Sequence, residues 1–142
     1  MIRYYENIDI TARNSFHVRQ TAKRLVEFDR AEELPELFAK YGTDDWYVIS
    51  GGNNILFTKD IDSLLITPCD DRIEIIAESD TAVRVKVGAG VEWDDLVAWS
   101  VERNLWGIEN LSLIPGKAGA APVQNIGAYG VEAKDTIRSV DM

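Results

Sequence analysis

The stretch IPGKAGAAPVQNIGAYG, residues 114–130, is a nearly uncharged ribbon of small residues. It holds four of the chain's ten glycines, four alanines and two of its four prolines, and Lys117 is its single charge although 27% of the whole chain is charged. Because glycine has no side chain, another backbone or a flat ligand can approach such a main chain closely. Composition leaves open whether the ribbon packs closely on another backbone or lies against a flat ligand. Lys117 could either approach a phosphate or extend into solvent.

A second glycine-rich stretch, ISGGNNIL at residues 49–56, directly follows a predicted strand. Successive backbone N–H groups around Gly51 and Gly52 can point into one concavity, which suits a diphosphate without needing a lysine. Asparagine and glycine are also common turn residues, so an ordinary turn between strands is the alternative. The loop is neither a Walker A loop nor a Rossmann fingerprint, because it lacks the Gly-Lys-Ser/Thr of the first and the following helix of the second.

Length and composition restrict the classes of protein that remain. The 142 residues suffice for one domain or two small ones, and the 46% hydrophobic content argues against disorder. A net charge of −9 disfavours nucleic acid as a partner. Cys69 and His17 are each the only residue of their type, so we expect no disulfide within the chain and no metal site. With no membrane span or signal peptide in the pattern, the sequence predicts a cytoplasmic protein without a membrane partner.

The first half of the chain alternates strand and helix patterns. We predict strands at 22–28, 46–50 and 63–68, with a helix after the first, so that residues 1–68 form a small β-α-β-β lobe. Residues 1–15 are polar and mixed, and no element is predicted there. The turn-rich run Pro68-Cys69-Asp70-Asp71 marks the expected domain boundary.

The helix of this lobe has clear end signals. Asp29 and Glu32 are spaced as a capping box, and Gly42 is a natural stop. Pro35 conflicts with a helix that begins at Asp29, because a proline inside a helix loses a hydrogen bond and clashes with the preceding turn. We therefore expect the helix either to begin nearer Ala31 or to kink.

The second half, residues 69–142, carries the pattern of a second α/β lobe. Strands are predicted at 72–78 and 81–88, joined by a turn at Ser79-Asp80, and a helix follows at about 92–103. The residues Pro122, Gln124 and Asn125 predict a short helix within the ribbon. The run TIRSV, 136–140, predicts one more strand, at which the second lobe stops incomplete.

Five pieces of this sequence resemble, in order, the UDP-N-acetylenolpyruvoylglucosamine reductase (MurB) family of peptidoglycan synthesis. The long stretch 114–132 is similar to the signature of that family and is the most specific piece. The others are Asn14-Ser15-Phe16, the GGNNIL loop, GAGVEW at 88–93 and GIENL at 107–111. The resemblance runs from about residue 14 to the end of the chain.

The resemblance implies an α+β fold of the two-lobed, FAD-binding vanillyl-alcohol-oxidase (PCMH) type, with the second lobe truncated. It also implies a set of cofactor-binding residues, and it gives Tyr129 a place on the nicotinamide or substrate side. Asn53 stands where the family commonly has serine. The diphosphate would be held by Gly51, Gly52, Asn53 and Asn54, and the flavin with its ribityl chain by Gly116, Gly119, Ala120, Ala121, Gln124, Asn125, Ile126 and Gly127.

The family's chemistry implies FAD as cofactor, NADPH as co-substrate and a UDP-sugar carrying an enolpyruvyl group as substrate. The serine, arginine and glutamate that assist in the family lie in later segments that this sequence does not contain, so no catalytic residue is assigned. We therefore expect a truncated chain that is inactive alone and that self-associates through exposed strand edges. Two alternatives stay open: another FAD-dependent oxidoreductase on the same scaffold, and a module that no longer binds flavin.

Overall fold

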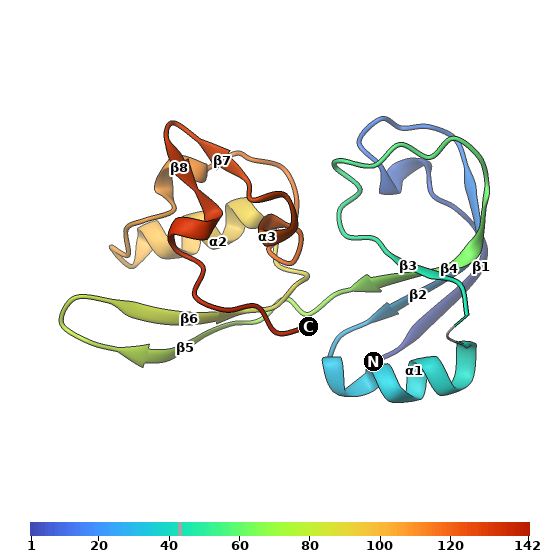
Figure 1. The fold of residues 1–142 in the computed structure, drawn as a ribbon, viewed down its shortest axis with the longest axis horizontal. Helices are drawn as coiled ribbons and strands as arrows, with labels where there is room; N and C mark the ends of the chain where they lie inside the picture. The colour runs from blue at the N-terminus through green and yellow to red at the C-terminus, as the bar shows by residue number, and fades with distance from the viewer. Residues whose placement is uncertain (43) are drawn as a thin grey trace. The chain divides into compact units, whose positions relative to one another are not determined.

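A computed structural model describes residues 1–42 and 44–142 of the chain. They form two compact units, Met1–Asp70 and Asp71–Met142 (Figure 1). Each unit combines strands with helices, with two buried apolar clusters in the first unit and one in the second. The mixture of helices and strands agrees with the predicted α+β class.

The first unit is built on a four-stranded sheet in the order β1-β2-β4-β3. β2 pairs with β4 and β3 with β4 in parallel, whereas β1 pairs with β2 antiparallel. β1 corrects the prediction that residues 1–15 carry no element: it is an edge strand with exposed positions, so its sequence is polar and lacks the apolar pattern of a buried strand. The predicted strands are confirmed, and the bounds are β1 Arg3–Asp9, β2 Thr21–Phe28, β3 Trp46–Val48 and β4 Ile61–Pro68.

The helix of the first unit begins as expected near Ala31, with a 3₁₀ turn, η2 (Ala31–Glu33), that leads into α1 (Leu34–Tyr41). Pro35 lies in the first turn, where its missing N–H has no intrahelical acceptor to lose. The predicted capping box was one residue out of place: the Glu33 carboxylate accepts from the backbone N–H of Arg30 at 3.2 Å. Gly42 ends the helix with φ of +92°, as predicted.

The two faces of this sheet are covered differently. Leu37 of α1 packs with Val26, Leu64 and Ile66 on one face. On the other face, Ile10, Ile49 and Phe57 from irregular segments pack over the sheet residues Leu25 and Leu65. Because parallel neighbours need a connection that crosses back along the sheet, residues 49–60 between β3 and β4 cannot form a tight turn. The GGNN loop therefore lies in a crossing segment and is no tight turn between adjacent strands, although Asn53 and Asn54 form a local turn within it.

The second unit begins with an antiparallel hairpin whose turn runs from Ser79 to Ala82. α2 follows, and its Trp93 and Val97 pack with Leu111 and Ala121 in the core. The predicted hairpin, helix and short helix of the ribbon are confirmed. The bounds are β5 Ile73–Glu78, β6 Val83–Val87, α2 Trp93–Glu102, η3 Glu109–Leu111, α3 Ala121–Gln124, β7 Gly127–Ala128, β8 Val131–Glu132 and η4 Ala133–Asp135.

The strand predicted at 136–140 is absent from the described chain. After η4 the backbone follows no regular element and pairs with none of the described strands. A β-rich run becomes a strand only where a neighbouring strand satisfies its backbone groups, and the local pattern does not report on that neighbour.

The β5–β6 hairpin leaves apolar side chains uncovered. Ile75 and Ile76 on β5 are 49% and 54% exposed. Exposed apolar residues on a two-stranded sheet are consistent with the expected self-association, which stays a prediction. Within residues 1–42 and 44–142, no helix has the length and apolar character needed to cross a membrane.

Candidate functional site

The GGNN loop is pressed against residues 13–15 of the same unit. Gly52 has φ of +68°, and a Cβ atom added there would lie 2.0 Å from the carbonyl oxygen of Arg13. No side chain fits in that space, so glycine is required here by a contact of the protein with itself. The contact fixes the depth at which the loop sits on segment 13–15.

Asn14 and Ser15 form the support under this loop. The buried Asn14 amide donates to the carbonyl oxygens of Ile10 at 3.0 Å and Val18 at 3.2 Å, and its Oδ1 accepts from Val18 N–H at 3.1 Å. The Ser15 backbone N–H donates to the Gly52 carbonyl at 3.1 Å. Ser15 Oγ also donates to the Asn53 carbonyl at 3.1 Å. The loop carbonyls are therefore held toward the protein.

The backbone N–H donors of the loop differ from its carbonyls, because they are not used in these contacts. Within residues 1–42 and 44–142, no hydrogen bond from the backbone N–H of Gly51, Gly52 or Asn53 is formed. Ser50 Oγ, directly before the glycines, is buried and has no hydrogen-bond partner in the part of the chain that the structure describes. Buried polar atoms are normally paired, and a cluster of free N–H groups suits an anion. These residues fit a diphosphate, and the structure brings them together in one loop with the exposed Asn54.

The ribbon in the second unit has its own support, the stretch GAGVEW. Ala118 N–H donates to the Val91 carbonyl at 2.8 Å, and Gly119 N–H to the Ala89 carbonyl at 3.1 Å. A Cβ atom on Gly119 would lie 2.6 Å from the Cβ of Ala89. Close packing of backbone on backbone thus accounts for Gly119, which was one of the two interpretations of the ribbon.

The rest of the ribbon uses its polar groups internally. The N–H groups of Ala120 and Ala121 bond to carbonyls within the ribbon, and that of Ile126 to the Ala121 carbonyl at 3.3 Å. Asn125 is left-handed with φ of +45°, and its Oδ1 accepts from Lys134 N–H at 3.1 Å. These donors are therefore not free for a ligand, and what the ribbon offers is a surface of small side chains.

Tyr129 lies at the tip of the β7–β8 hairpin. Tyr129 and Gly130 both have positive φ, +54° and +81°, as the two central residues of a tight two-residue hairpin turn require. Tyr129 is 91% exposed. Lys117 lies 3.7 Å from the Glu92 carboxylate within its own unit, so its side chain does not extend freely into solvent.

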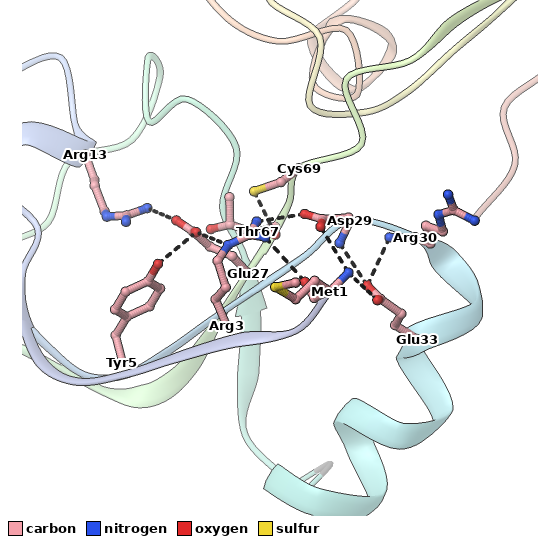
Figure 2. A network of polar contacts seen from close by, with 10 residues as sticks. All are labelled: Met1, Arg3, Tyr5, Arg13, Glu27, Asp29, Arg30, Glu33, Thr67 and Cys69. Atoms are coloured by element: carbon pink, nitrogen blue, oxygen red, sulfur yellow. Dashed lines mark hydrogen bonds and ion pairs between the residues drawn. The ribbon is translucent and has the colours of Figure 1, made fainter.

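A cluster of charged side chains in the first unit includes the Glu27 carboxylate on β2, which faces two arginines (Figure 2). Arg3 Nε lies 3.0 Å and Arg13 NH1 2.8 Å from its oxygens. Burial alone would raise the pKa of Glu27, but the hydrogen bonds from Arg3 and Arg13 outweigh burial and lower it. Nearby, hydrogen bonds from Arg3 and the N-terminal amine lower the pKa of Asp29 to about 2.

Residues 22–142 match the FAD binding domain family (FAD_binding_4). The chain belongs to this FAD-binding family. FAD is thus the cofactor of this family, and the matched residues include both the loop with its unpaired donors and the ribbon.

Curated relatives of this chain carry a common name. It is 42% identical over 137 residues to the UDP-N-acetylenolpyruvoylglucosamine reductase of Bacteroides fragilis (strain YCH46) and 43% identical over 141 residues to that of Neisseria gonorrhoeae. These alignments cover 96% and 98% of this chain but 41% and 40% of the relatives. The chain thus spans about two fifths of the length of the curated relatives it matches.

A solved structure shares the fold. The structure of UDP-N-acetylenolpyruvylglucosamine reductase (MurB) from Thermus caldophilus superimposes with a TM-score of 0.71 at 21% identity, covering 93% of this chain and 45% of that one. The predicted fold is confirmed by this likeness.

Sequence reasoning found the two glycine-rich segments but missed what supports them. Asn14-Ser15-Phe16 and GAGVEW were noticed only as pieces of a resemblance, without a role. The glycines are compatible with a second backbone segment close by, but the sequence does not say which segment that is.

Proposed function

We propose that this chain is the FAD-binding part of a MurB-type reductase. The diphosphate of FAD binds at Gly51, Gly52, Asn53 and Asn54, and the flavin with its ribityl chain lies on the small residues of the ribbon between Gly116 and Gly127. Tyr129 faces the substrate. The observation that supports this best is the set of unpaired donors at Ser50–Asn53 in a chain of the FAD-binding family.

Bound FAD would supply transfer of hydride from NADPH to the enolpyruvyl double bond of a UDP-sugar. The residues of this chain would bind and orient that cofactor: the loop N–H groups would neutralise the diphosphate, and the ribbon would accept the flat ring system without steric hindrance. No catalytic residue is proposed among the described residues. A reductase of this kind is expected in the cytoplasm.

FAD binding is tested by titrating the purified chain with FAD and following the flavin fluorescence. We expect a yellow protein that binds one FAD per chain and keeps it through gel filtration. A protein that stays colourless with excess FAD would contradict the proposal and favour a module that does not bind flavin.

A matched pair of variants tests the site itself. Ser50 Oγ and Thr67 Oγ1 are both buried hydroxyls without a partner in the first unit, but only Ser50 adjoins the loop. We expect Ser50→Ala to raise the Kd for FAD about tenfold, as loss of a hydrogen bond to a charged group does. Thr67→Val should leave the Kd unchanged, and equal effects of the two variants would remove Ser50 from the site.

The activity of the parent protein needs a separate assay. A longer protein that contains this chain should oxidise NADPH only when the UDP-sugar enolpyruvate is present, whereas the chain alone should not. NADPH oxidation with a different acceptor would instead indicate another oxidoreductase on the same scaffold.

A further inference from the structure

We infer that Arg13 is a positioning residue for the diphosphate loop and acts through its ion pair with Glu27. This inference rests on the proposed function, because it concerns the loop that is proposed to hold the diphosphate. Arg13 is not among the residues proposed to hold the diphosphate: its side chain faces a carboxylate on the sheet, and its main chain faces the loop.

The two ends of Arg13 make the connection. Its NH1 lies 2.8 Å from Glu27 Oε1, and its guanidinium lies 5.9 Å from the centre of the Tyr5 ring. Its carbonyl oxygen lies 2.0 Å from where a Cβ of Gly52 would be, so the loop rests directly on this peptide group. Figure 2 shows Arg13 reaching Glu27 beside Tyr5 and Arg3.

Glu27 is a fixed partner for this arginine. It belongs to β2, and its side chain is only 13% exposed. Arg3 Nε at 3.0 Å and the Tyr5 hydroxyl at 3.2 Å donate to its other oxygen. Loss of one partner of a largely buried carboxylate costs free energy, so the Arg13 side chain is held in one place.

The position of the Arg13 backbone is tied to the position of its side chain. Arg13 is the last residue of the short 3₁₀ helix η1 (Thr11–Arg13), and Asn14 and Ser15 follow it directly. Fixing the guanidinium therefore fixes the start of segment 13–15. This segment lies against Gly52, and its Ser15 donates to the Gly52 and Asn53 carbonyls. The N–H groups proposed to bind the diphosphate belong to the same short loop as these carbonyls, so their orientation depends on the same support.

The test compares two arginines that share one carboxylate. Arg13→Met removes the ion pair next to the loop, whereas the control Arg3→Met removes the other arginine pair of the same Glu27, at the start of β1. We expect Arg13→Met to raise the Kd for FAD about tenfold, as loss of a supporting partner does elsewhere. Arg3→Met should leave the Kd within about twofold of the unchanged protein, and Arg13→Lys should restore most of the affinity.

Two further readouts separate a positioning role from simple loss of stability. ADP, which carries the diphosphate without the flavin, should lose affinity for Arg13→Met by the same factor as FAD. The melting temperature should fall at least as much for Arg3→Met, which also loses its pair to Asp29. Equal changes in Kd for the two methionine variants, or none for Arg13→Met, would overturn the inference.

The outcome also distinguishes this inference from the proposed function. If the unchanged chain binds neither FAD nor ADP, the proposed function fails. If it binds both and Arg13→Met binds them equally well, the proposed function stands and the positioning role alone is wrong.

Discussion

The GGNN loop of the first unit and the ribbon of the other unit are both rich in glycine, but they differ in which backbone N–H groups remain free to bind a ligand. Both carry a glycine pressed on another segment of the chain, Gly52 on Arg13 and Gly119 on Ala89. Among the residues that the structure describes, none accepts a hydrogen bond from the loop N–H groups of 51–53, whereas the ribbon N–H groups of Ala118–Ala121 are bonded within the second unit. The loop can therefore donate hydrogen bonds to an anion, and the ribbon can present a smooth surface to a flat ring.

The difference shows that glycine content alone does not identify a phosphate site. The same residue type serves close backbone packing in both segments, and only the fate of the neighbouring N–H groups separates a donor site from a packing site. The two supports can be disturbed separately, which gives ways to test the comparison.

The largest effect is expected from Gly52→Ala. The new Cβ would meet the Arg13 carbonyl at 2.0 Å, and the residue has φ of +68°, so the free energy of unfolding should fall by about 3–5 kcal/mol. Gly42→Ala is the matched control, because it also has positive φ but no atom within 4 Å of the new Cβ. Chemical denaturation should show the smaller loss for Gly42→Ala, and equal losses would mean that the contact with Arg13 is unimportant.

A smaller loss is expected from Gly119→Ala in the ribbon. Its Cβ would meet the Ala89 Cβ at 2.6 Å, an overpacking that costs about 1–3 kcal/mol. Adding Ala89→Gly removes that methyl group and should recover part of the stability, measured by the same denaturation. A double variant no more stable than Gly119→Ala alone would contradict this packing.

An element of the fold could be predicted from the sequence where its own residues determine it, and not where a distant partner does. The strand at 22–28 and the helix ended by Gly42 carry their own patterns and were predicted correctly. β1 was missed because a polar edge strand is specified by its partner β2, and a strand at 136–140 was predicted where no described partner exists.

The site followed the same rule. The glycines of the loop and the ribbon are visible in the sequence, but whether their N–H groups are free depends on hydrogen bonds to distant residues such as Ala89 and Val91. The support from Asn14 could not be predicted either, because a polar residue shows no sign in sequence that it will be buried.

The support of the loop should respond to acid through Glu27. Its pKa lies below the ordinary value of 4.5, so its stabilising effect is complete above that pH and is lost as the pH falls through the lowered pKa. The gap in melting temperature between the unchanged protein and Glu27→Gln should therefore be widest near pH 7 and narrow toward pH 2. A gap independent of pH would mean that the charge of Glu27 does not matter.

The smallest effect is expected from Lys117→Met. The pair of Lys117 with the half-exposed Glu92 is long, at 3.7 Å, and such pairs contribute less than about 0.5 kcal/mol. FAD affinity should also stay unchanged, because the ribbon is proposed to act through shape and not charge. A clear rise in the Kd for FAD would show that Lys117 contacts the phosphates after all.

The central claim is that one FAD molecule is bound by the loop through hydrogen bonds and by the ribbon through contact. Nuclear magnetic resonance of the 15.9 kDa chain, with backbone amide signals followed during titration, tests it most directly. FAD should shift the signals of Gly51–Asn53 and of residues 116–127 together, with one Kd, whereas ADP should shift those of Gly51–Asn53 alone. Signals that respond to FAD in only one of the two segments, or with two different Kd values, would contradict the account.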